Sequence, residues 1–191
     1  MLNTILISLL LSFGVEDTNA TFKVNAAESK VEWKATKVVG GGHEGTVNIA
    51  EGSLEIEKGQ LTGGSFTIDM TSIACTDLEG EWKGKFEGHL KNDDFFSVDT
   101  NKTASLKITS VKNTAGKSVV SADITIKGIT QSITFPADVK VAGDKVTASG
   151  LITLDRTKFG VKYGSSSFFD DLGDKAISNE FTLNVAVVAS K

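Results

Sequence analysis

Apolar and polar residues alternate one by one along most of the chain. Between residues 30 and 38, Val31, Trp33 and Ala35 share one face, and the polar residues between them share the other. A period of two predicts a β-strand that buries one face. By the same criterion we expect further strands at residues 45–49, 53–57, 61–70, 104–109, 120–127, 133–141, 146–154 and 181–187.

Short glycine-containing turns separate these segments, at residues 40–42, 58–60, 128 and 143–145. Strands joined by short turns form an antiparallel meander, which closes into a barrel or folds into a sandwich. We expect an all-β fold, an extended antiparallel eight-stranded barrel, because closure removes exposed sheet edges. Such a barrel is either filled by side chains or holds one small ligand. The inward positions are apolar, so a ligand held inside would be apolar as well.

The alternation fails in the middle of the chain, around residues 83–97. Gly84 and Gly88 should break any long regular element, and the residues at 92–94 resemble a cap or solvated turn. We therefore expect a short helical or irregular segment that closes one end of the barrel. Phe95 and Phe96, which follow the polar run, should point inward.

The N-terminus is a separate element. Residues 5–15 are apolar but too few to span a bilayer, which takes roughly 20 residues. Small residues at 18–20 suit signal-peptidase cleavage, so residues 1–20 are interpreted as a signal peptide and residues 21–191 as one domain. No Lys or Arg precedes the apolar run, which leaves a misassigned start or an N-terminal strand as alternatives.

Charge and cysteine content narrow the function classes. The formal net charge is −4 and no basic cluster is present, which argues against a nucleic-acid partner. Cys75 is the only cysteine, so no intrachain disulfide can form, and we expect it to be buried. A catalytic role for Cys75 would need a histidine base, and the sequence places neither His43 nor His89 beside it.

The sequence predicts neither a metal site nor a cofactor. Two scattered histidines do not supply the three or four convergent ligands of a zinc site. The aspartate pairs at 93–94 and 170–171 lack the ligand spacing of a calcium loop and are interpreted as caps or solvated turns. The serines at 165–167 lie in no nucleophile motif.

Six segments stand out in order along the chain: VEWK (31–34), GHEGTV (42–47), LTGGSFTIDM (61–70), GHLKNDDFF (88–96), IKGIT (126–130) and LDRTKFGVKYG (154–164). Together they resemble the YceI-like family of bacterial periplasmic polyisoprenoid-binding proteins, from about residue 22 to the C-terminus. The resemblance implies an extended, lipocalin-like barrel whose apolar tunnel holds an isoprenoid or fatty-acyl chain, export to the periplasm, and no catalytic centre. The segment at 78–82 is more acidic than is usual in this family, which affects the predicted rim of the tunnel.

Large apolar side chains are the candidates for the tunnel wall, although ordinary core packing would give the same pattern. Three polar residues, His43, Arg156 and Tyr163, are candidates for selecting a head group at one end. For Arg156 the alternative is a structural ion pair with Asp155, and for His43 it is a structural hydrogen bond. The apolar candidates are Trp33, Phe66, Ile68, Phe86, Phe95, Phe96, Phe135 and Phe159.

Together these features predict a non-catalytic periplasmic carrier for an isoprenoid quinone, a polyprenyl phosphate or a fatty-acyl lipid. Contact with membranes would be transient, for ligand exchange, and a homodimer that joins tunnel mouths is compatible with the sequence but not required by it. One alternative is a solid-cored structural or stress-response barrel. The other is an enzyme acting on such a lipid, which would need reactive groups inside the tunnel.

Overall fold

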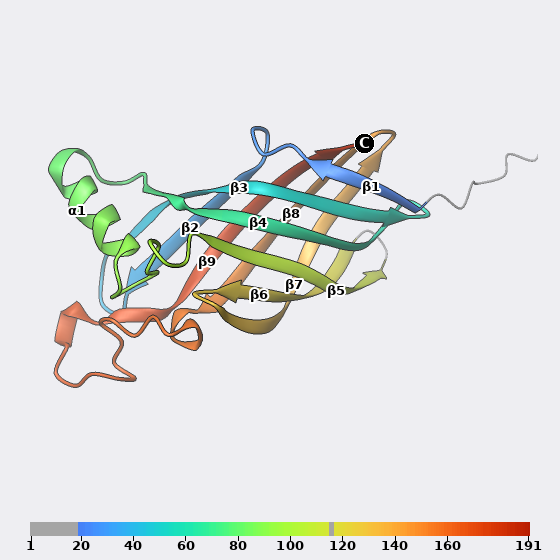
Figure 1. The fold of residues 1–191 in the computed structure, drawn as a ribbon. Coiled ribbons are helices and arrows are strands. Elements are labelled where there is room, and N and C mark those ends of the chain that lie inside the picture. The colour runs from blue at the N-terminus through green and yellow to red at the C-terminus, as the bar shows by residue number, and fades with distance from the viewer. Residues whose placement is uncertain (1–18, 115–116) are drawn as a thin grey trace, which may run out of the picture.

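The computed structural model describes residues 19–114 and 117–191 (Figure 1). Within those ranges the chain forms nine strands, one α-helix and two short 3-10 helices. The elements are β1 (Asn19–Val24), β2 (Lys30–Lys37), β3 (Gly42–Glu57), β4 (Gln60–Cys75), α1 (Gly80–Lys91), β5 (Thr103–Thr114), β6 (Lys117–Ile126), β7 (Ile129–Ala142), β8 (Lys145–Asp155), η1 (Arg156–Phe159), η2 (Gly173–Lys175) and β9 (Ile177–Ser190).

Strands β2 to β9 close into the eight-stranded antiparallel barrel that the alternation predicts (Figure 1). The strands follow the order β3-β2-β9-β8-β7-β6-β5-β4, and the β3–β4 pairing completes the ring. The ninth strand, β1, pairs with the same two neighbours as β2, namely β3 and β9. β1 contacts residues 53–57 of β3, and β2 contacts residues 42–47. β1 and β2 therefore share one position in the wall.

The predicted break between residues 49 and 53 is wrong, because β3 runs through it as one 16-residue strand. Buried positions are Val47 and Ile49 before this point but Leu54 and Ile56 after it, so the inward parity changes from odd to even. The register against β4 shifts between Ile49 and Glu51. A bulge of this kind adds a residue and bends a strand without ending it.

The central segment is helical, as expected, but its bounds differ from the prediction. Helix α1 begins at residue 80, and Gly84 and Gly88 lie inside it. An added Cβ at either glycine would meet no atom within 4 Å, so both face open space, where glycine weakens a helix without ending it. Asn92 ends the helix, its N–H donating to the carbonyl oxygens of Gly88 and His89, and does not begin one.

The predicted signal peptide lies almost entirely outside the described residues and stays a prediction. Its last two residues, Asn19 and Ala20, pair with Glu57 and Ile56 at the start of β1. No helix among the described residues is long and apolar enough to cross a membrane.

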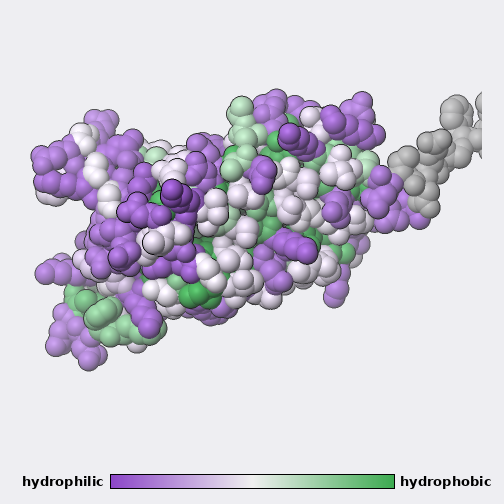
Figure 2. Space-filling view, in the orientation of Figure 1, coloured by the Kyte–Doolittle hydropathy of each residue, from purple (hydrophilic) through white to green (hydrophobic). Residues whose placement is uncertain are grey.

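Two adjacent aromatic residues are exposed on the surface. Phe168 and Phe169, in the loop between η1 and β9, are about half exposed. Figure 2 shows an apolar patch at this projecting loop, below the end of the barrel that carries α1. The pair is not part of the cavity wall described below.

The Trp33 indole packs directly on the backbone of the neighbouring strand. Trp33 is cross-strand partner to Gly45, and a Cβ on Gly45 would overlap both the indole ring and the carbonyl oxygen of Ala74. Only glycine leaves room for the indole, which is 7% exposed, to lie against the wall.

We predict opposite effects for two glycine-to-alanine substitutions. Gly45→Ala should lower the free energy of unfolding by about 2 kcal/mol, because overpacking forces the Trp33 ring or β4 to move. Gly84→Ala should raise it by about 0.5 kcal/mol or more, because alanine favours a helix and the site is open. Urea unfolding of both variants beside the parent checks this, and equal midpoints for all three proteins would contradict it.

Candidate functional site

The barrel encloses a cavity of about 350 Å³. Each of the eight barrel strands contributes inward side chains to its wall, and Phe86 and Leu90 of α1 and the Phe95–Phe96 pair complete it. Among the described residues no carboxylate and no cysteine lines this cavity. A volume of this size lies within the roughly 300–1,000 Å³ range of small-molecule sites. The barrel is thus hollow, which argues against the solid-cored alternative.

Most of the side chains proposed from the sequence meet at this cavity. Phe159 and Tyr163 do not: Phe159 is buried in the core, and Tyr163 is 44% exposed on the surface. Whether the lining residues contact a ligand stays a prediction. The nine that line the cavity are Trp33, His43, Phe66, Ile68, Phe86, Phe95, Phe96, Phe135 and Arg156.

Apart from Ile68, the aliphatic residues of the cavity wall were not among the candidates proposed from the sequence. It favoured aromatic residues, although the alternation of the last strand had already marked Leu183, Val185 and Val187 as one face. All three line the cavity. All inward-facing residues of each strand, and not the aromatic ones alone, would have been better candidates for the cavity wall.

The Arg156 side chain, just after β8, links the loop that follows η1 to the start of β9. Its side chain is only 4% exposed, and burial lowers the pKa of its guanidinium, an effect that the neighbouring Asp155 partly offsets. The Asp155 carboxylate accepts from the N–H of Thr157 and caps η1. The guanidinium donates to the carbonyl oxygens of Val161, Tyr163, Ile177 and Ser178, at 2.8–3.1 Å.

We predict that Arg156→Met lowers the free energy of unfolding by about 3 kcal/mol, because it leaves several buried carbonyl oxygens without donors. Arg156→Lys should recover only part of this loss, since an ammonium cannot reach acceptors spread along two segments. Urea denaturation of both variants measures the effect. A loss below about 1 kcal/mol for Arg156→Met would contradict the structural role.

His43 and Phe86 separate the cavity from a shallow pocket on the outside. Their ring centroids lie 4.3 Å apart, and the Trp33 ring lies 6.4 Å from Phe86 on the inner side. Both residues line the cavity and also the outer pocket. The outer pocket is completed by Leu78, Trp82, Lys85 and His89.

A second aromatic group ties α1 to the loop after η1. The His89 ring lies 4.9 Å from Phe95 and 4.7 Å from Tyr163, both edge-on, and its Nε2 lies 3.0 Å from an Asp94 oxygen. Lys127 donates to the carbonyl oxygen of Phe95 at 2.7 Å. His89 thus links the end of α1 to the loop after η1.

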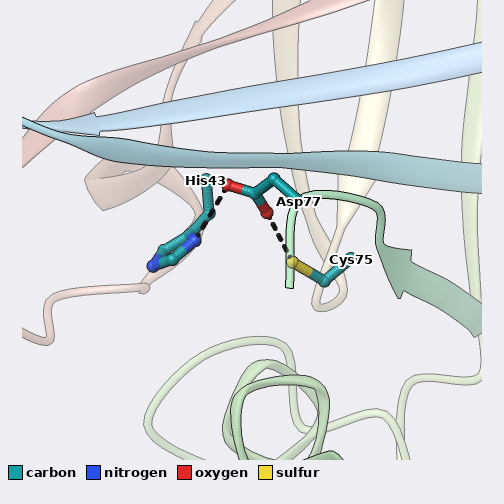
Figure 3. A group of neighbouring side chains, drawn as sticks. All are labelled: His43, Cys75 and Asp77. Atoms are coloured by element: carbon teal, nitrogen blue, oxygen red, sulfur yellow. Dashed lines mark hydrogen bonds and ion pairs between the residues drawn. The ribbon is translucent and has the colours of Figure 1, made fainter. Parts of the chain in front are cut away.

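The structure brings together three residues that the sequence could not place (Figure 3). The Cys75 thiol donates to Asp77 Oδ1 at 2.8 Å, and His43 Nδ1 lies 3.1 Å from Asp77 Oδ2. Cys75 is fully buried, as expected; burial and the bond to Asp77 raise the pKa of its thiol. Burial alone would raise the pKa of Asp77, but the hydrogen bonds from Cys75 and His43 outweigh it and lower that pKa.

The lowered pKa of Asp77 predicts a loss of stability in acid. A carboxyl group whose pKa falls on folding stabilises the protein above its unfolded pKa, here about 3.8. That contribution disappears as the pH falls through the lower folded value. Asp77→Asn should therefore show a shallower decline of unfolding free energy below about pH 4 than the parent. Urea unfolding at several pH values measures both slopes, and parallel curves would refute the prediction.

The fold and the cavity define the class of this protein: a closed antiparallel β-barrel that encloses an apolar cavity lined by residues of the eight barrel strands. Within that class, the YceI-like domain family matches residues 22–189, so the chain belongs to this family.

Relatives in sequence carry the name UPF0312 protein. One from Pseudomonas aeruginosa (strain LESB58) is 29% identical over 103 residues, 51% of this chain and 50% of the relative. One from Staphylococcus aureus (strain USA300) is 36% identical over 89 residues, 42% of this chain and 48% of the relative. This chain thus aligns with about half the length of these relatives. One from Pseudomonas putida (strain F1) is 23% identical, covering 84% of this chain and 80% of the relative.

Solved structures share the fold. BcnA of Burkholderia cenocepacia matches with a TM-score of 0.71 at 22% identity, covering 87% of this chain and 99% of BcnA. A polyisoprenoid binding domain from Saccharophagus degradans, implicated in plant cell wall breakdown, matches with a TM-score of 0.64 at 14% identity, covering 88% of this chain and 97% of that domain. At these identities the likeness establishes the barrel fold alone.

Proposed function

We propose that this protein binds one long apolar chain of an isoprenoid or fatty-acyl lipid inside the barrel and carries it without chemical change. The observation that carries the proposal is the hollow barrel, whose wall is mostly apolar and, among the described residues, contains no carboxylate. A catalyst would need a nucleophile or an acid–base pair beside its substrate. Membership of the YceI-like family and the polyisoprenoid-binding name of one structural neighbour support the same class of ligand.

Affinity in such a site comes from removing the chain from water. Each buried methylene contributes about 0.8 kcal/mol, so ten contribute on the order of 8 kcal/mol before the cost of ordering the chain. The lining supplies few polar groups, so the head group would lie at a mouth of the cavity. His43, whose ring faces both the cavity and the outer pocket, is well placed to meet it.

Export and ligand exchange complete the proposal. The apolar segment at residues 5–15 supports export to a compartment such as the periplasm, where a lipid tail needs a carrier across an aqueous space. Exchange with a membrane would be brief, and the exposed Phe168 and Phe169 offer apolar contacts for it. Quinones, polyprenyl phosphates and fatty acids remain the candidate ligands.

We predict that an organic extract of the natively purified protein contains one long-chain lipid in near-stoichiometric amount. Mass spectrometry of the extract, set against a mock purification, identifies it and its head group. An empty extract, together with no thermal shift on adding quinones, polyprenyl phosphates or fatty acids, would overturn the carrier proposal.

Filling the cavity should weaken binding. Ala148 lines the cavity, whereas its neighbour Thr147 on β8 is exposed and does not. Ala148→Phe should displace about two methylenes of ligand and weaken lipid binding about tenfold, while the matched Thr147→Phe should not. Equal lipid retention by both variants, with unchanged folding by circular dichroism, would place the lipid elsewhere.

A further inference from the structure

The contact of His43, Cys75 and Asp77 joins three different ligand chemistries at one point. An imidazole nitrogen, a thiol sulfur and a carboxylate oxygen come together, each available as one ligand atom, and no two of these atoms are more than 4.8 Å apart. These are the three side-chain ligand types that zinc uses in proteins. Cys75 and Asp77 do not line the cavity, so the group is distinct from the lipid site except at His43.

The separations are close to those that a tetrahedral ion requires. Bonds of about 2.0–2.3 Å to zinc place neighbouring ligand atoms roughly 3.3–3.8 Å apart. Cys75 Sγ and His43 Nδ1 already lie 2.8 and 3.1 Å from oxygens of Asp77. A pair at the 4.8 Å limit would have to close by only about 1 Å, which side-chain rotation can supply.

The surroundings hold these groups in place. Cys75 lies opposite Gly45 in the β3–β4 ladder, and its N–H donates to Glu87 Oε1 of α1 at 2.8 Å. The Phe86 ring, one residue earlier in the helix, packs on the His43 imidazole. Two strands and one helix therefore surround the cysteine and the histidine, while the side chains of His43 and Asp77 remain 36% and 31% exposed. Fixed ligands with one open side are the usual arrangement of a metal site that keeps an exchangeable position.

We propose that His43 Nδ1, Cys75 Sγ and one oxygen of Asp77 bind a single thiophilic divalent cation of the zinc type, with water as the fourth ligand. On binding, the sulfur–hydrogen bond breaks, the proton leaves to solvent and a sulfur–metal bond forms, without oxidation or reduction. The sequence alone predicts no metal site, because the two histidines are far apart along the chain and neither can be placed beside Cys75. The fold supplies the missing proximity.

The chain contains its own control for this site. His89 pairs with Asp94 at 3.0 Å, much as His43 pairs with Asp77, but no cysteine joins that pair among the described metal-ligand groups. A histidine–aspartate pair alone should bind a divalent cation weakly. The two pairs therefore separate a true three-ligand site from general attraction of cations to histidine and carboxylate.

The test is a titration of the reduced, untagged full-length protein with Co²⁺, followed by absorption spectroscopy. We expect one Co²⁺ per chain, a sulfur-to-cobalt charge-transfer band in the near ultraviolet and the intense visible bands of a tetrahedral ion. Zn²⁺ added in equimolar amount should remove these bands. The absence of the charge-transfer band in the reduced parent would overturn the proposal.

Variants assign the ligands. Cys75→Ser should abolish the charge-transfer band, and His43→Gln should weaken Co²⁺ binding at least about tenfold, while His89→Gln should bind as the parent does. Because Cys75 is buried and its substitution can unfold the barrel, circular dichroism accompanies each titration. The half-exposed His43 keeps the test decisive: parent-like binding by a folded His43→Gln protein, or loss of binding in His89→Gln, would refute the assignment.

Discussion

Closure of the sheet is the constraint on which the rest of this structure depends. The β3–β4 ladder, formed by the two longest strands, joins the first and last positions of an eight-membered ring. Once the ring is closed, every inward side chain faces a common interior, and at eight strands that interior is large enough to remain partly empty. The cavity thus follows mainly from strand number and inward side-chain size, and α1 and the Phe95–Phe96 pair complete its wall.

A closed barrel also has two open ends, which other parts of the chain can cover. At the end that carries α1, the open strand ends are covered by side chains from elsewhere in the chain. Arg156 fastens the loop after β8 to the start of β9 through main-chain carbonyls, and the rings of His89, Phe95 and Tyr163 join α1 to that loop. The Arg156 guanidinium and these three rings therefore hold the segments at this end of the barrel together. Among the described residues, His43 is the polar one that lines both the cavity and the outer pocket.

The fold could be predicted from the sequence because alternation is a local signal that each strand repeats. The same signal led to wrong predictions where a feature interrupts the local pattern without ending the strand or helix. The change of inward parity between Ile49 and Leu54 suggested two strands, since a bulge and a turn both interrupt a period of two. Gly84 and Gly88 suggested a break, because composition does not tell that their side of α1 faces open space.

The candidate site was predictable in part for the same reason. Inward positions such as Phe66 and Phe135 follow directly from the alternation and line the cavity. The role of Arg156 depends partly on two carbonyl groups more than twenty residues away, and the meeting of His43 with Cys75 depends on the β3–β4 register. The spacing of residues along the chain predicts neither of these contacts.

The partition formed by His43 and Phe86 has a kinetic consequence. The side chains of both residues line the cavity and the outer pocket, so rotation of their rings would open a passage for a guest without breaking the hydrogen bonds of the barrel ladder. Rotations of exposed side chains take picoseconds to nanoseconds, far faster than the opening of a sheet. The speed of exchange would then be governed by the exposure of the lipid tail to water. A cation bound to His43 would hold the imidazole ring in place and thereby slow the exchange of ligand.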